Sequence, residues 1–165
     1  MGLEKDHIYL YRIPTLIRKA LLTLPYLALL VILLLAIIAP ILEYQRLEVS
    51  RTLYDTTHNI CNQLPTRCLW ILTSPMGLCA RCFGIYLTML ATGIFLIRFG
   101  SKHIYWKSAV LLMIPCIIDG STQYLGHRLS NNGLRLITGS LAGIGMGLFF
   151  FPLYHRFIDF ITKRR

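Results

Sequence analysis

Two neighbouring stretches organise this chain: His58-Asn59-Ile60-Cys61-Asn62-Gln63-Leu64-Pro65-Thr66-Arg67-Cys68 and Cys79-Ala80-Arg81-Cys82-Phe83-Gly84-Ile85-Tyr86. They hold four of the five cysteines. The pairs His58-x2-Cys61 and Cys79-x2-Cys82 have the spacing of a paired Cys-x2-Cys zinc site in which histidine replaces the first cysteine. Thiolate and imidazole suit zinc, and a gap of two residues lets both side chains reach one ion. The spacing therefore predicts a Cys3His zinc site within a loop at 58–82.

The same cysteines fit other chemistry. Cys79-x2-Cys82 at the outer end of a membrane span would suit a thiol–disulfide redox site, a layout that resembles quinone-coupled disulfide-forming membrane enzymes. A structural disulfide pair and a chance spacing are further interpretations. Cys68 is an alternative ligand, a disulfide partner of Cys61, or a bystander. If His58 is not a ligand, a metal here keeps an open fourth position and can activate water or a carbonyl.

Hydropathy predicts a membrane protein. The chain has 165 residues, is 55% hydrophobic and has a mean hydropathy of +0.59. Apolar runs long enough to span a bilayer predict helices at about 20–42, 75–99, 106–125 and 134–154. The first run is too long for the apolar region of a signal peptide. We expect one all-α integral membrane domain over 1–165, a four-helix transmembrane bundle with the cysteine-rich loop between spans one and two.

The predicted start of the second span determines where the cysteines lie relative to the helix. Ser74-Pro75 is typical of a helix N-cap followed by proline at the first helical position. A helix from there would place Cys79, Cys82 and Tyr86 on one face, since they are three and seven residues apart. Both cysteines would then lie near the positive end of the helix dipole, which favours thiolate.

Lysine and arginine counts predict the orientation. The N-terminal leader, the 98–107 loop and the C-terminal tail together carry eleven of these residues, and the other side carries six. Both termini are therefore expected in the cytoplasm of a cell whose plasma (inner) membrane holds the chain. The cysteine loop and the 119–135 segment would then share the outer face. The net charge of +10 lies beside apolar runs, which favours anionic lipid headgroups over nucleic acid as the partner.

Polar residues near the outer ends of the third and fourth spans predict a pocket. Asp119 and Gln123 are four apart on one helical face, and a carboxylate in a membrane helix needs a partner. Arg135 or Arg128 could supply it as a structural ion pair. Asp119, Gln123 and Arg135 could instead be catalytic residues that line, with Gln63, a pocket for a lipid-like ligand.

Two further patterns concern binding and packing. The first consists of four arginines, Arg67, Arg81, Arg128 and Arg135. They could form an anion-binding face for lipid phosphate, or they could simply extend to lipid headgroups. The other is a small-residue ridge at Gly139, Gly143 and Gly147, where a helix can approach closely. This ridge is expected to pack against a neighbouring helix and is also a candidate face for oligomerisation.

Several of these residues match the blocks of an uncharacterised family of small prokaryotic multi-pass membrane proteins, which the chain resembles over about 57–143. The first block is H-x2-C-x-Q-x-P-x-R, here His58, Cys61, Gln63, Pro65 and Arg67. The second is C-x-R-C-x-G-x-Y, here Cys79, Arg81, Cys82, Gly84 and Tyr86. Then follow Asp119, Gly120 and Gln123, and after them Asn132, Arg135 and Gly139. The chain has Asn62 where the family often has histidine. The resemblance implies a membrane protein and implies no activity.

Three hypotheses about function follow. The first is a zinc-type site beside a polar pocket for a lipid-like ligand. The second is a membrane thiol–disulfide oxidoreductase that uses Cys79 and Cys82. The third is a non-enzymatic membrane scaffold or transporter subunit. The sequence leaves open whether the protein is an enzyme.

Overall fold

The computed structural model describes residues 15–99, 103–126 and 130–163. Residues 1–14 of the predicted leader at 1–19, and Arg128, therefore lie outside the described residues. The long helices are α1 (Thr15–Tyr44), α3 (Ala80–Arg98), α4 (Trp106–Tyr124) and α5 (Asn132–Lys163). Between the first two lie α2 (Val49–His58), a 3-10 turn η1 (Pro65–Arg67), and the antiparallel strands β1 (Cys68–Ile71) and β2 (Ser74–Cys79). The described chain is mostly helical, as predicted, and contains a small hairpin that was not predicted.

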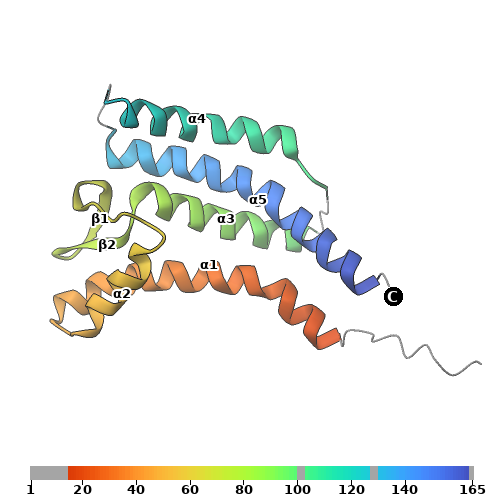
Figure 1. Cartoon of the computed structure of the whole chain (residues 1–165), viewed down its shortest axis with the longest axis horizontal. Helices are drawn as coiled ribbons and strands as arrows, with labels where there is room; N and C mark the ends of the chain where they lie inside the picture. Colours follow the sequence, from red (N-terminus) through yellow and green to blue (C-terminus); the bar gives the residue numbers. More distant parts are fainter. Residues whose placement is uncertain (1–14, 100–102, 127–129, 164–165) are drawn as a thin grey trace, which may run out of the picture.

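The long helices lie side by side in the order α4, α5, α3 and α1 (Figure 1). α5 packs extensively on both α3 and α4. α1 packs on α3, α2 and β2, and it also meets α5, where Tyr26 stacks on Phe151 and Arg18 forms an ion pair with Asp159. The predicted four-helix bundle is not confirmed, because α1, α3 and α5 contact one another while α4 lies at the end of the row and packs mainly on α5.

Glycines allow α5 to hold a neighbour on each side. A side chain at Gly139 would collide with the Arg81 backbone, and one at Gly143 would collide with Ile85 and Thr88. Gly145 lies against the other neighbour, since a Cβ there would be 2.7 Å from the Ala109 carbonyl oxygen in α4. The ridge predicted from the sequence thus packs against α3 of the same chain. It does not form an open face for a second copy.

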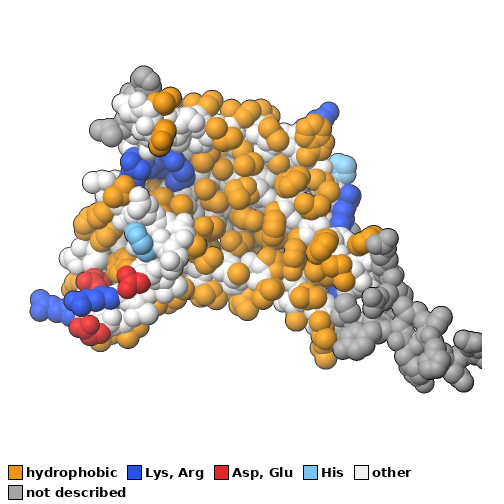
Figure 2. Space-filling view, viewed as in Figure 1, with side chains coloured by type: hydrophobic (Ala, Val, Ile, Leu, Met, Phe, Trp, Pro, Cys, Tyr) orange, Lys and Arg blue, Asp and Glu red, His pale blue; other side chains and the backbone are white. Residues whose placement is uncertain are grey.

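Three helices of the described chain are long and apolar enough to cross a membrane: Leu16–Tyr44, Ala80–Arg98 and Asn132–Thr162. They overlap the first, second and fourth predicted spans. α4 covers the third predicted segment, but it falls outside this set and carries the charged residues Lys107 and Asp119. Hydrophobic side chains cover the middle of the molecule in Figure 2, and most of the visible charged side chains lie toward its two ends.

The predicted start of the second span is wrong. Ser74-Pro75 does not begin a helix, because Ser74–Cys79 forms β2 and pairs with β1. Cys79 is the N-cap of α3 instead, and its sulfur accepts a hydrogen bond from the Cys82 backbone N–H at 3.5 Å. Strand pairing across the hairpin thus moves the helix start to Ala80, so that Cys79 leaves the helix and Cys82 stays in its first turn.

We predict that Gly143→Ala weakens the α3–α5 contact. A methyl group there meets the Ile85 carbonyl and the Thr88 hydroxyl, which itself donates to the Ser140 carbonyl oxygen at 2.8 Å. Overpacking of this kind costs about 1–3 kcal/mol of unfolding free energy. Denaturant titration of detergent-solubilised protein, followed by circular dichroism, measures the loss. Gly133→Ala in the same helix is the control, because its nearest neighbour would be 3.5 Å away. Equal effects of the two substitutions would contradict the close contact.

Candidate metal centre and polar network

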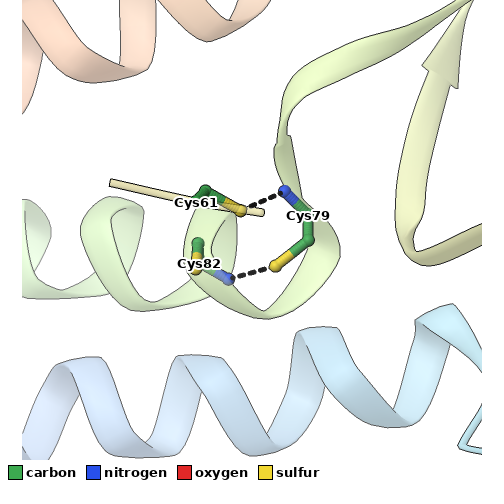
Figure 3. A group of neighbouring side chains, drawn as sticks. All are labelled: Cys61, Cys79 and Cys82. Atoms are coloured by element: carbon green, nitrogen blue, oxygen red, sulfur yellow. Dashed lines mark hydrogen bonds between the residues drawn. The ribbon is translucent and has the colours of Figure 1, made fainter. Parts of the chain in front are cut away.

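Three cysteine sulfurs converge at the end of the molecule where the hairpin meets α3 (Figure 3). Cys61 lies in the loop after α2, Cys79 caps α3, and Cys82 lies in the first turn of α3. Their sulfur atoms all lie within 4.8 Å of one another, and none is in a disulfide. A tetrahedral zinc ion with sulfur ligands at about 2.3 Å holds them about 3.8 Å apart. The cluster could therefore hold a metal ion, and sulfur donors are of the type that zinc prefers.

Backbone and side-chain hydrogen bonds favour a thiolate in this cluster. The Cys79 backbone N–H donates to the Cys61 sulfur at 3.2 Å (Figure 3). The Cys79 and Cys82 thiols also donate to it, which holds the pKa of the Cys61 thiol well below its ordinary value. Because a thiolate is the form that binds metal, Cys61 is prepared as a ligand.

Gln63 fixes the loop that carries Cys61. Its backbone adopts a left-handed conformation with φ of 46°. Its side-chain amide donates to the Tyr54 carbonyl at 3.0 Å, to the Gly77 carbonyl at 2.8 Å and to the Thr57 hydroxyl at 2.5 Å. Gln63 thus joins α2 to β2 and fixes the conformation of the loop that carries Cys61.

Gly77 allows β2 to lie close to the first helix. A Cβ at this position would be 3.1 Å from both the Ala36 Cα in α1 and the Thr57 hydroxyl in α2. The cysteine cluster is consequently anchored to α1, α2 and α3 at once.

Two predicted participants lie outside the cluster. His58 ends α2 with an exposed side chain and does not belong to the cysteine group. Cys68 is also outside the group, although it faces Cys79 in the hairpin register and is completely buried. Burial raises the pKa of the Cys68 thiol to about 12, so it stays protonated at neutral pH.

Asp119 is buried in α4 and lies in a polar network. Its carboxylate forms an ion pair with Arg81 and accepts a hydrogen bond from the Gln123 amide at 2.8 Å. Gln123 in turn accepts hydrogen bonds from Arg135 at 3.2 and 3.3 Å. Arg135, which was predicted to pair directly with Asp119, is instead connected to it through Gln123. Gln123 lies one turn after Asp119 and occupies the space between Asp119 and Arg135.

The network continues to the hairpin. Arg135 donates to the Asn132 side-chain oxygen at 3.0 Å, and the Asn132 amide donates to the Cys68 carbonyl at 3.0 Å. At its other end the network reaches Arg81, which stands between Cys79 and Cys82 in the sequence. The cysteine cluster and the Asp119 network are therefore neighbours that share one short segment of α3.

The remaining predicted residues lie around this site. Tyr86 packs against the apolar group that includes Cys61, and Arg67 is exposed at the end of η1. Sequence reasoning missed Thr57, a buried hydroxyl that takes part in holding Gln63. The signal was the spacing of Ser50 and Thr57, which are seven residues apart and form the buried face of α2.

The apolar helices and the polar cluster at one end define an integral membrane protein. The chain belongs to the family described as Predicted membrane protein (DUF2085), whose model matches residues 61–149. The matched segment begins at Cys61 and contains the three clustered cysteines and the whole Asp119 network. It leaves out α1, α2 and His58.

Two archaeal relatives are similar to this chain. An uncharacterized protein of Methanocaldococcus jannaschii is 36% identical over 115 residues, which cover 67% of this chain and 73% of the relative. An uncharacterized protein of Methanothermobacter thermautotrophicus is 38% identical over 98 residues, which cover 58% of this chain and 88% of the relative. No solved structure matches the chain.

The Arg81–Asp119 ion pair yields a prediction about stability. Asp119→Leu leaves the Arg81 guanidinium without its carboxylate, so the free energy of unfolding should fall by about 3 kcal/mol. Arg81→Met in the same chain removes the unpaired charge, so the double variant should lose less than the sum of the two single variants. Denaturation in detergent micelles measures all three.

A second pair of substitutions controls for general effects of charge removal. Arg51 lies in α2 and contacts Glu48 at the exposed surface. Arg51→Met combined with Asp119→Leu should give additive losses. Additive losses for the Arg81 and Asp119 pair as well would contradict a coupled buried ion pair.

Proposed function

We propose that Cys61, Cys79 and Cys82 bind one zinc ion and that the ion keeps a fourth position for an exchangeable ligand. The observation that carries the proposal is the convergence of three sulfur atoms within 4.8 Å. The exposed position of His58, outside the cysteine group, supports three protein ligands over the four of a closed structural site. A metal bound in this way can act as a Lewis acid on an oxygen of a bound molecule.

Charge balance supports a divalent ion. Three cysteine thiolates that bind one divalent ion leave a single negative charge on the cluster. Arg81 and Arg135 exceed Asp119 by one positive charge, which offsets this negative charge. Little charge is therefore left uncompensated in a partly buried site, where uncompensated charge is costly.

The network beside the cluster supports binding of a lipid-like molecule at the same end. Asp119 and Arg135 are buried, polar and hydrogen-bonded, and they lie at the ends of the helices α4 and α5. Polar groups at this depth of a membrane protein mark ligand pathways more often than fold requirements. We propose that Asp119, Gln123 and Arg135 hold the polar part of a ligand near the metal.

A thiol–disulfide oxidoreductase is the second candidate, because Cys79 caps α3 and Cys82 follows three residues later, with both thiols free. An enzyme of this type needs its thiolate at the attacking cysteine of the pair. Here a third sulfur, that of Cys61, lies within 4.8 Å of both sulfurs of the pair. Three converging sulfur atoms suit a metal ion, so the geometry favours metal binding.

The metal proposal predicts about one zinc ion per chain in purified protein. Cys61→Ser, Cys79→Ser and Cys82→Ser should each remove most of the zinc, because two thiolates bind the ion far more weakly than three. His58→Ala and Cys68→Ser are the matched controls and should keep it. Elemental analysis of detergent-purified protein, with a free-thiol count, measures both. Loss of zinc in His58→Ala would restore the four-ligand site, and a stoichiometric Cys79–Cys82 disulfide without zinc would favour the redox enzyme.

We also propose that α4 crosses the cell membrane, which makes four spans. Its 19 residues reach about 28 Å, close to the thickness of the hydrocarbon layer. It runs beside α5 in Figure 1, and Leu111, Ile114 and Ile118 on it are exposed apolar residues suited to lipid. Both termini are then cytoplasmic, and the cysteine cluster faces outward.

This topology is testable with reporter domains fused to each end of the full chain in intact cells. Four crossings place both reporters on the same side of the membrane, and the distribution of lysine and arginine favours the cytoplasmic side. A cysteine introduced at the exposed Leu72 in the hairpin should react with an impermeant maleimide from outside. Reporters on opposite sides would show that α4 does not cross.

A further inference from the structure

Three arginines gather where the hairpin meets the beginnings of α3 and α5, and Figure 2 shows basic side chains on the surface at this end. Arg81 is in the first turn of α3, Arg135 in the first turn of α5, and Arg67 ends η1. Arg135 donates to Asn132, whose amide donates to the carbonyl of Cys68, the residue after Arg67. Arg81 and Arg135 are joined through Asp119 and Gln123. The three arginines thus lie in one region, where their like charges repel one another.

Much of the hydrogen-bonding capacity of these arginines is unused within the described chain. The Nε of Arg81 is buried and has no hydrogen-bond partner there. The side chain of Arg67 is exposed and forms no ion pair or side-chain hydrogen bond with the described residues. Arg135 is 6% exposed, and its partners are the neutral amide oxygens of Gln123 and Asn132. A guanidinium group can donate five hydrogen bonds, and it prefers anionic oxygens.

The charges in this region sum to a positive surplus that one anion can neutralise. The arginines contribute three positive charges, and Asp119 contributes one negative charge. The cysteine cluster with a divalent metal contributes a second negative charge. One positive charge remains, and it lies beside the N-termini of two helices, whose backbone N–H groups also favour anions. A phosphodiester carries one negative charge, which matches this surplus.

We propose that Arg67, Arg81 and Arg135 form a binding site for a phosphodiester oxyanion of a lipid headgroup, placed beside the metal centre. The site lies at the end of three membrane-spanning helices, where headgroups are found. Arg67 supplies a free guanidinium from the surface, and Arg81 connects the anion to the segment that carries Cys79 and Cys82. The inference rests on the proposed metal centre, because the metal sets the charge of the cysteine cluster, and it names a phosphate-bearing lipid as the ligand class.

The test uses the full chain, loaded with zinc and solubilised in a neutral detergent. Native mass spectrometry follows the binding of dioleoylphosphatidylglycerol, which has a phosphodiester, and of dioleoylglycerol, which lacks it. Arg67→Gln should weaken phosphatidylglycerol binding about tenfold, the effect expected from one charge-assisted contact. Arg51→Gln removes an equal charge from α2 on the same side and should leave binding unchanged. Arg67 is exposed, so its replacement should not disturb the fold.

Sodium phosphate, added as a competitor, separates the two sources of the anion. If phosphatidylglycerol resists millimolar phosphate, the lipid headgroup is the ligand. If phosphate displaces it with the same dependence on Arg67, the oxyanion site is confirmed and its natural ligand is soluble. Equal binding of the two lipids, or equal effects of Arg67→Gln and Arg51→Gln, would overturn the site. Zinc measured in the same samples distinguishes the two proposals. Zinc without lipid selectivity contradicts only the phosphodiester site, whereas absence of zinc contradicts the metal centre.

Discussion

The ion pair between Arg81 and Asp119 connects the parts of this molecule that the chain separates. Arg81 stands between the two cysteines at the start of α3, and Asp119 is buried in α4. α3 and α4 are not adjacent in the row of helices, because α5 lies between them (Figure 1). The pair therefore reaches across the end of α5 and fixes the ends of three helices. Removing Arg81 would leave the buried Asp119 carboxylate without its cation, and removing Asp119 would leave the partly buried Arg81 without its carboxylate.

The glycine ridge of α5 makes this contact geometrically available. Gly139 lies directly against the Arg81 backbone, so close that a side chain there would collide with it. The start of α3 is thus pressed onto α5, and the Arg81 side chain can pass the helix to reach Asp119. The packing against α5 and the ion pair with Asp119 both fix Arg81, and they therefore also fix the cysteines on either side of it. The ridge is consequently occupied within the chain.

The sequence predicted what depends on local pattern. Apolar runs predicted helices that overlap α1, α3, α4 and α5, and cysteine spacing predicted that Cys61, Cys79 and Cys82 would converge. The hairpin was missed because strand pairing joins residues apart in sequence, while Ser74-Pro75 has a strong local preference for a helix start. His58 had the correct spacing from Cys61, but α2 continues through it, and the buried face of that helix includes its neighbour Thr57. Spacing alone cannot show which way a helix turns its side chains.

The partner of Asp119 was also not predictable from local sequence. Distance along the chain favoured Arg135, which is sixteen residues away, over Arg81, which is thirty-eight residues away. In the fold, Gln123 occupies the space next to Asp119 and turns its amide oxygen toward Arg135, so one amide serves both charged groups. The Gln123 amide donates to the carboxylate and accepts from the guanidinium, which satisfies both without bringing them together. Arg135 therefore keeps its positive charge without a carboxylate in contact, at the end of the molecule where the cysteines lie.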